Sequence, residues 1–190
     1  MANNNGMGLL RLTNTRMIYK NFSGKKGDFN AEGDRNFGAV IDPETAQALI
    51  DDGTRVKTIP PRDDDPDGVE TNWIKVKVNF NSRQQPKVHL IKVDPDDPEN
   101  VKKMVQVKLD EDTINQLDWI HNSIILNVDM NIRFSRYPAR PGRTAGISNY
   151  LDALYVTIMD DPLERKYSNI RFAGGPNPYE EDDDLPFDED

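Results

Sequence analysis

The sequence predicts a mainly β protein: an antiparallel barrel with short helical inserts and a disordered acidic tail. Three long segments alternate apolar and polar residues at the two-residue period of a half-buried strand. The sequence does not alternate regularly between strands and long helices, so it does not indicate a parallel sheet. The last twelve residues, 179–190, hold eight acids and no base, which is the composition of a disordered tail.

The three long strands are predicted at 71–80, 126–135 and 150–159. In the first, one face holds Ile74, Val76, Val78 and Phe80, and the other holds Trp73, Lys75 and Lys77. In the second, the apolar face holds Leu126, Val128, Met130, Ile132 and Phe134. In the third, Leu154, Val156 and Ile158 lie opposite Tyr155 and Thr157. Shorter strands are predicted at 9–22, 36–41, 54–59, 87–93 and 102–108.

Only short helices are indicated. Pro43 suits a first helical position after Asp42 as N-cap, which predicts a helix over 43–51 that ends before Gly53. A second helix is predicted at 111–121, with Asp110 as its cap and with Ile114, Leu117 and Ile120 spaced to bury. A third is predicted at 161–167. Seven or eight strands with short helices are typical of an antiparallel barrel, and the OB-fold is the small barrel that binds nucleic acids on one face.

Composition excludes several functional classes. The chain has no cysteine and only two histidines, His89 and His121, so we expect no metal site and no cofactor. No apolar run is long enough to span a bilayer and no leader opens the sequence, so we expect no membrane partner and a cytoplasmic location. Residues 1–8 are polar enough to be a disordered N-terminus.

The charge is segregated along the chain. The net charge is −9, but eight of the 33 acids lie in 179–190, which leaves 25 acids against 24 bases elsewhere and a net charge of −1. The windows 9–27, 71–93 and 130–150 contain 14 of the 24 bases, no acid, and several aromatic residues. Acids gather instead in 60–70, 94–100 and 110–118. This segregation predicts a basic face backed by acidic loops.

The face formed by Trp73, Lys75 and Lys77 carries the chemistry of a nucleic-acid contact. An aromatic ring on the non-core side of a strand can stack on a base, and adjacent lysines can neutralise phosphates. Alternatively, a loop buries Trp73 and the lysines form an ordinary solvated face. Trp119 falls in the second predicted helix, so we expect its fluorescence to respond less than that of Trp73 to single-stranded DNA.

Two glycine-containing loops are basic. The segment 138–146 carries Arg140 and Arg143 and is either a mobile tip that clamps a nucleic-acid strand or a disordered, charged turn. The segment 20–37 places Lys25 and Lys26 at its tip. No phosphate-binding, hydrolase or metalloprotease motif is present. The acid pairs Asp63–Asp65 and Asp160–Asp161 lie in loops, where solvated charge is the simpler interpretation, so the sequence indicates no catalytic residues and no enzyme.

The C-terminal segment combines acids with an apolar ending. After a linker at 171–178 the tail contains Asp182, Asp183, Asp184, Leu185, Pro186 and Phe187. Leu185 and Phe187 are apolar, so exposure to water does not stabilise them, and they suit an apolar pocket on a partner protein. The neighbouring acids would attract the tail to the basic rim of that pocket.

This tail resembles the acidic tip of bacterial single-stranded-DNA-binding proteins, which docks on replication, recombination and repair enzymes and competes with DNA. Residues 9–170 resemble a family of phage and prophage single-stranded-DNA-binding proteins. The likeness is carried by Asn21-Phe22-Ser23-Gly24-Lys25, Gly33-Asp34-Arg35-Asn36-Phe37, the 151–158 strand and Asp161-Pro162-Leu163-Glu164. It implies an OB-fold core. In this chain Asp188-Glu189-Asp190 follow Phe187, so Phe187 would dock internally.

The leading hypothesis is therefore a non-enzymatic protein that coats single-stranded DNA without strong sequence preference during phage replication or recombination, in the host cytoplasm. Its predicted DNA-binding residues are Tyr19, Lys20, Lys25, Lys26, Trp73, Lys75, Lys77, Arg133, Tyr137, Arg140, Arg143 and Tyr155. Replication and recombination proteins are the partners expected for the tail. Two alternatives remain: an acidic module that mimics nucleic acid, and a Mg²⁺-dependent nuclease built on loop aspartates.

Overall fold

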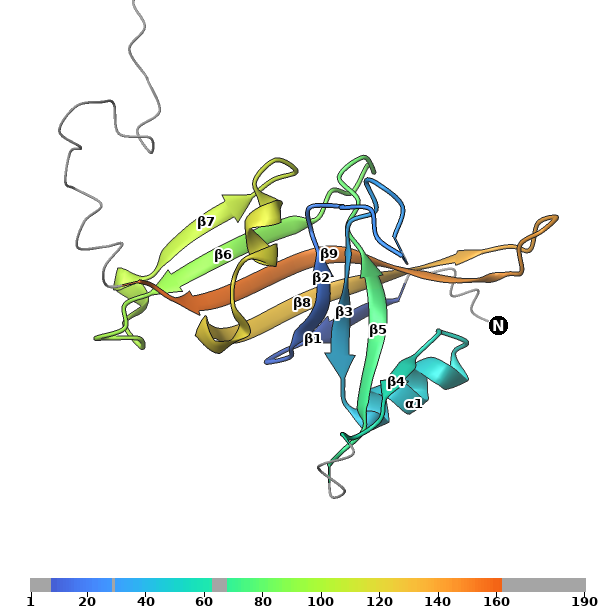
Figure 1. The fold of residues 1–190 in the computed structure, drawn as a ribbon, viewed down its shortest axis with the longest axis horizontal. Helices are drawn as coiled ribbons and strands as arrows, with labels where there is room; N and C mark the ends of the chain where they lie inside the picture. Colours follow the sequence, from blue (N-terminus) through green and yellow to red (C-terminus); the bar gives the residue numbers. More distant parts are fainter. Residues whose placement is uncertain (1–7, 29, 63–67, 162–190) are drawn as a thin grey trace, which may run out of the picture. The chain divides into compact units, whose positions relative to one another are not determined.

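The computed structural model describes residues 8–28, 30–62 and 68–161 (Figure 1). The chain divides into a unit of residues 1–159 and a unit of residues 160–190, and all the strands among the described residues lie in the first. The predicted helix at 161–167, the linker at 171–178, the tail at 179–190 and the acids Asp63 and Asp65 lie outside the described residues. None of the described helices is long and apolar enough to cross a membrane.

Nine strands belong to one sheet in the described part of the chain. They are β1 Leu9–Leu12, β2 Met17–Asn21, β3 Asn36–Ile41, β4 Lys57–Ile59, β5 Thr71–Lys77, β6 Lys87–Val93, β7 Val105–Leu109, β8 Ile125–Tyr137 and β9 Gly146–Met159. The predicted strand at 9–22 is two strands, because a turn at 13–16 separates them and Asn14 takes a φ of 50° there. The chain is mainly β, as predicted.

The sheet is mixed rather than purely antiparallel. Its main path runs β1-β8-β9-β5-β3-β2, with β4 beside β5, and with β6 beside both β9 and β7. Strands β6 and β9 run parallel from the Lys87–Ala153 pair to the Val93–Met159 pair, and β5 meets β9 in parallel at Lys77–Tyr150. The antiparallel expectation is wrong for these two pairs. Alternation of apolar residues determines which face is buried but not which strand lies alongside.

The two ends of the main path, β1 and β2, approach one another through the turn that joins them. Thr15 N donates to Val128 O of β8 at 3.0 Å, and Val40 N of β3 donates to Arg16 O at 3.0 Å. No β1–β2 ladder forms among the described residues. Figure 1 shows β2, β3 and β5 crossing the long β8–β9 hairpin at a steep angle. The turn therefore links both ends of the sheet without completing a ladder around it.

Most of the predicted apolar faces form the core. Residues Ile74, Val76, Val78, Phe80, Val128, Met130, Ile132, Leu154, Val156 and Ile158 are all buried. Two residues of these faces differ: Phe134 is only partly buried, and Leu126 is 43% exposed. The register of β8 against β9 shifts between Ile125 and Asn127, so Leu126 is an extra residue that faces solvent.

The helix at Pro43–Asp51, α1, is confirmed, and Thr45 N donates to Asp42 Oδ1 of the N-cap at 2.8 Å. The predicted helix at 111–121 is instead a short 3₁₀ turn, η2, at Ile114–Asp118. Its apolar residues recur every third position, which is the period of a 3₁₀ helix rather than an α-helix. Ile114 and Leu117 are nevertheless fully buried. Two more 3₁₀ turns, η1 Val101–Lys103 and η3 Asn122–Ile124, flank β7 and β8.

Candidate nucleic-acid interface

The strands that form the outer face of the sheet, meaning the side of β2, β3, β4 and β5 opposite the core, contribute no acid to it. None of these four strands contains Asp or Glu, and all nine described strands together contain only Asp129 and Asp152. Because Ile74 and Val76 point into the core, their neighbours on β5 point outward: Trp73, Lys75 and Lys77. The predicted aromatic and basic face of β5 is therefore present.

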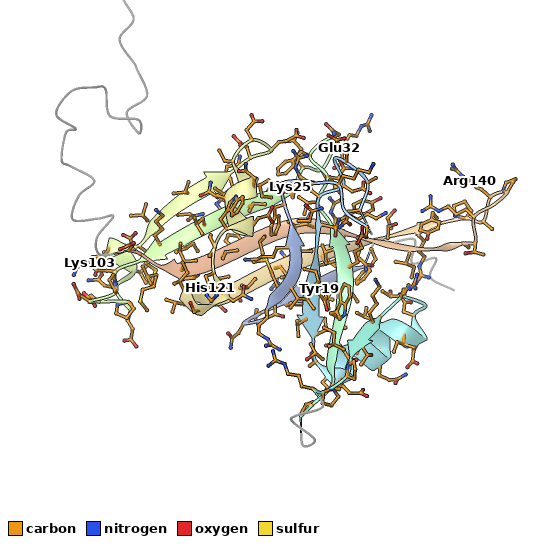
Figure 2. The ribbon with its side chains drawn as sticks, in the orientation of Figure 1. Tyr19, Lys25, Glu32, Lys103, His121 and Arg140 are labelled. Atoms are coloured by element: carbon orange, nitrogen blue, oxygen red, sulfur yellow. The ribbon has the colours of Figure 1, made fainter. Side chains whose placement is uncertain are left out.

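Tyr19 reaches this outer face through a bulge in β2. Ile18 pairs with Gly38 and Asn21 pairs with Asn36, so Tyr19 and Lys20 together lie opposite one residue of β3. Tyr19 has a φ of 50°, a left-handed conformation that such bulges usually give to glycine. Regular alternation after buried Met17 would turn Tyr19 inward; instead its side chain is 63% exposed (Figure 2).

The rings of Tyr19 and Trp73 are in contact, with centroids 5.2 Å apart and planes tilted by 54°. Trp73 is half-buried because its ring lies across Gly38 of β3, where an added Cβ would meet Trp73 Cε3 at 2.8 Å. Lys57 Nζ of β4 lies 4.7 Å from the centroid of the Trp73 ring, in a cation–π contact. Three different strands thus build one aromatic pair with an ammonium group over it.

Two further lysines extend the positive charge along β5. Lys75 Nζ donates to Asn30 Oδ1 at 3.0 Å. Burial lowers the pKa of Lys75, Asp34 partly offsets this, and the nearby ammonium groups of Lys57 and Lys77 lower it further. These three like charges favour a bound anion, because an anion relieves their mutual repulsion.

Tyr150 continues this group of side chains onto β9. It pairs with Lys77, whose Nζ lies 5.8 Å from the centroid of the Tyr150 ring. On its other side it pairs with Arg133 of β8. A pocket of about 270 Å³ opens beside it, lined by Asn79, Ser82, Arg133, Ser135, Tyr150 and Leu151.

Two predicted phosphate contacts are engaged within the protein. Lys20 Nζ donates to Ile120 O at 2.6 Å, and burial lowers its pKa while Asp118 partly raises it. The Arg133 guanidinium donates hydrogen bonds to the side-chain and main-chain oxygens of Gln84. It also forms an ion pair with Asp152 Oδ1 at 3.0 Å. Both cations join distant segments, which sequence spacing does not reveal.

The loop after β2 places Lys25 and Lys26 in exposed positions, as predicted. It is closed by a Gly33 N to Gly24 O hydrogen bond of 2.8 Å, and both glycines take positive φ. Lys25 Nζ lies 5.0 Å from the ring centroid of Trp119, which is 77% exposed. Trp119 is the more exposed of the two tryptophans, because η2 buries Ile114 and Leu117 and leaves the next ring outside. The smaller fluorescence response expected of Trp119 stays a prediction.

The hairpin between β8 and β9 ends in an ordered turn. Arg140 and Arg143 exchange two backbone hydrogen bonds of 2.8 Å around Pro141 and Gly142, and Gly142 has a φ of 78°. Proline followed by a positive-φ glycine is the signature of a type II turn. The Arg143 guanidinium lies 3.9 Å from the Tyr137 ring centroid, and Figure 2 shows Arg140 at the hairpin tip. The predicted hairpin residues therefore form a separate basic group.

Tyr155 belongs neither to the outer face nor to the basic group on the hairpin. Its ring stacks on His89 of β6, with centroids 5.1 Å apart and planes 8° from parallel. Its neighbour on β8 is the acid Asp129. The predicted partner-binding residues Asp182, Asp183, Asp184, Leu185, Pro186 and Phe187 lie outside the described residues.

Sequence reasoning missed four residues that the fold brings to these groups. Lys57 lies in a predicted strand but pairs with Trp73 only through the β4–β5 ladder. Gly38 left a signal, because glycine inside a strand often marks a close approach of another group. Tyr150 and Trp119 gave no such signal, since their exposure depends on strand pairing and on the orientation of η2.

A sheet surface that combines aromatic rings with ammonium groups is an arrangement by which proteins hold single-stranded nucleic acids. The profile of the family described as "Putative phage ssDNA-binding domain" matches residues 3–187. The chain therefore belongs to this family of phage single-stranded-DNA-binding domains, as the sequence resemblance implied.

Solved structures of phage proteins resemble the chain. A C-terminally truncated single-stranded DNA-binding protein from bacteriophage Enc34 is 15% identical, with 82% of this chain and 88% of that chain covered and a TM-score of 0.46. The Enc34 protein in complex with ssDNA gives 15% identity, 82% and 89% coverage and a TM-score of 0.44. The single-stranded DNA binding protein gp2.5 of bacteriophage T7 is 11% identical, with 90% of this chain and 98% of that chain covered and a TM-score of 0.35. No curated protein sequence matches the chain.

Proposed function

We propose that this protein binds single-stranded DNA, largely without sequence preference, on the outer face of β2–β5. The Tyr19–Trp73 ring pair, with Lys57 over it on strands that contain no acid, is the observation that carries the proposal. Exposed Tyr19 offers its ring to a base, and every base presents a π face, so stacking there is tolerant of sequence. Family membership supports the same function.

The lysines take the phosphates in this proposal. Lys57, Lys75 and Lys77 lie on neighbouring positions of β4 and β5, close enough for the charges of the first and third to lower the pKa of the second. A strand laid along β5 would bring phosphates to these ammonium groups while its bases stack beside Tyr19. Arg140, Arg143 and Tyr137, on the hairpin tip, would contact a strand that extends past β9.

The proposal also covers the closure of the sheet, the role of the tail and the mode of action. The turn at 13–16 hydrogen-bonds to both β8 and β3, which supports a sheet that curves into an OB-like barrel. Residues Asp182, Asp183, Asp184, Leu185, Pro186 and Phe187 would recruit replication or recombination proteins. The protein would act by coating DNA rather than by catalysis.

A salt series with fluorescently labelled oligo-dT tests the binding. Affinity should fall as salt rises, with a log–log slope of about −2 if three lysines each contact a phosphate of a single strand. A duplex of the same length should bind more weakly, because its bases are already stacked on one another. Equal affinity for both forms would refute a stacking mode.

Two variants that each remove one exposed ammonium group provide the matched comparison. Lys77→Ala should reduce the salt slope and the affinity, whereas Lys102→Ala, in η1, should change neither. Equal effects of the two variants would mean that the outer face is not the binding surface. Absence of binding at low salt, even without residues 179–190, would instead favour the nucleic-acid-mimic alternative.

A further inference from the structure

Trp119 is the most exposed aromatic side chain among the described residues, at 77%. Lys25 Nζ lies 5.0 Å from its ring centroid, so the ring already has a cation beside it. An exposed ring with an ammonium group beside it offers a π face on which a base can stack and a charge that can meet its phosphate. Trp119 directly follows η2, as the residue that caps its C-terminal end, and it lies outside the strands β2–β5 to which the proposed function assigns DNA.

The Trp119 ring is held in place by its neighbours. Buried Ile114 and Leu117 anchor η2 in the core. The Asp118 carboxylate accepts hydrogen bonds of 2.8 Å from both Phe22 N and Ser23 N. These bonds fix the turn that carries Trp119 to the loop that carries Lys25, so the pair is preorganised.

A basic hollow lies in the loop that carries Lys25. It has a volume of about 610 Å³ and is lined by Ser23, Gly24, Lys25, Lys26, Glu32 and Gly33. Two of its six lining residues are lysines and one is an acid. Lys25 thus belongs to both the hollow and the Trp119 contact, which places a basic space with ample room for a phosphate next to a stacking ring.

The path from this group to the outer face is short. Lys20 follows Tyr19 in β2, and its Nζ bonds the carbonyl of Ile120, which follows Trp119. From the length of that chain of contacts, the Cα atoms of Tyr19 and Trp119 are no more than about 20 Å apart. Figure 2 labels Tyr19 on β2 and Lys25 in the loop that follows it.

We propose that Trp119 and Lys25 form a second stacking site for single-stranded DNA: Trp119 stacks on a base, and Lys25 with Lys26 contacts the adjoining phosphate. The site rests on the proposed function and extends it, because one strand would run from the outer face along β2 to η2. The bound strand would then be longer than the outer face alone can hold.

Single-tryptophan proteins test the contact directly, because the chain has only two tryptophans. In Trp73→Phe the remaining fluorescence comes from Trp119, and poly-dT should quench it at concentrations where labelled-DNA anisotropy shows binding. Unquenched Trp119 fluorescence in the DNA-bound protein would overturn the second site. Quenching of Trp73 in Trp119→Phe reports the outer face separately.

A length series separates the two proposals. Trp119→Ala should lose about tenfold or more in affinity for oligo-dT of about 12 and 16 nucleotides, and less for about 4, within the ~4–16-nucleotide site sizes of comparable domains. Lys25→Ala should show the same length dependence, and Lys102→Ala should not. Wild-type binding with no loss in Trp119→Ala at any length would overturn the second site alone. No binding by the wild-type protein would overturn the proposed function itself.

Discussion

Tyr19 combines a strained backbone with an exposed ring. A left-handed φ is unfavourable for an L-residue by about 1–2 kcal/mol relative to glycine. The bulge that imposes it turns Tyr19 towards solvent beside Trp73. Strain of this kind persists where the surrounding structure enforces it, and it is frequent at functional sites.

Tyr19→Gly should therefore separate stability from binding. Glycine relieves the backbone strain, which offsets the lost ring contact with Trp73 of about 0.5–1.5 kcal/mol. We expect the free energy of unfolding in urea to change by less than about 1 kcal/mol. Affinity for oligo-dT should fall by about 1–3 kcal/mol. Tyr19→Phe, which keeps the ring, is the control, and a loss of stability that matched the loss of binding in Tyr19→Gly would contradict the argument.

Gly38 leaves room for the Trp73 ring. An added Cβ would lie 2.7 Å from Ile18 Cγ1 and 2.8 Å from Trp73 Cε3, so Gly38→Ala should displace the ring. We expect a loss of about 1–3 kcal/mol in unfolding free energy, the usual range for overpacking, together with weaker DNA binding. Near-ultraviolet circular dichroism would report the moved indole. Gly27→Ala is the control, because nothing lies within 4 Å of its added Cβ.

At the scale of elements, the short helix α1 depends on its first residue. The Asp42 carboxylate accepts hydrogen bonds from both Thr45 Oγ1 and Thr45 N, at 2.6 and 2.8 Å. These bonds, the side-chain one first, lower the pKa of Asp42 below its usual value of 3.8. A carboxylate with a lowered pKa in the folded state stabilises the protein above its unfolded pKa, and this contribution disappears as the pH falls through the folded value.

Asp42→Ala should cost about 1 kcal/mol of unfolding free energy at pH 7 by removing this cap. The difference from the wild-type protein should shrink as the pH falls below the 3.8 reference, because the wild-type carboxyl then becomes protonated too. Urea unfolding at a series of pH values measures it. Asp42→Asn, which keeps a capping oxygen, should lose less at pH 7, and a pH-independent difference for Asp42→Ala would show that the ionised cap is not responsible.

On the scale of the whole molecule, opposite charges are kept in different places. The nine described strands contain only two acids, whereas residues 179–190 contain eight. The tail therefore accounts for most of the net charge of −9. A chain segment of this charge competes with phosphates for any basic surface it can reach.

Deleting residues 179–190 should therefore tighten oligo-dT binding, and the gain should diminish as salt screens the tail. Anisotropy titrations at low and moderate salt measure both effects. The double substitution of Leu185 and Phe187 by alanine keeps all eight acids, so it should leave DNA affinity unchanged while weakening any partner that docks on the apolar pair. Unchanged affinity after deletion would show that the tail does not compete.

The local parts of the fold were predictable from the sequence for physical reasons. Alternation with a period of two places Ile74 and Val76 inward and Trp73 and Lys75 outward, whatever strand lies next to them. Asp42 before Pro43 specifies a helix start through local hydrogen bonds. The i+3 spacing in 111–121 identified the anchors Ile114 and Leu117, although the turn they anchor is 3₁₀.

The candidate site was only partly predictable, because it depends on contacts between distant segments. Trp73 and Tyr19 were both expected to bind, but their contact requires the β2 bulge and the gap left by Gly38. Lys20 had the right charge and neighbourhood in sequence, yet its ammonium is engaged by the carbonyl of Ile120, one hundred residues away.

By itself, the sequence determined that this protein is mainly β, that its acids are concentrated outside its strands, and that its family is that of phage single-stranded-DNA-binding domains. Only the tertiary structure decided which cations and rings face solvent together. The physical reason is that side-chain direction is local, set by backbone periodicity. Neighbourhood, by contrast, is set by strand pairing and register, here the parallel β6–β9 ladder and the bulge at Tyr19, and so depends on the whole chain.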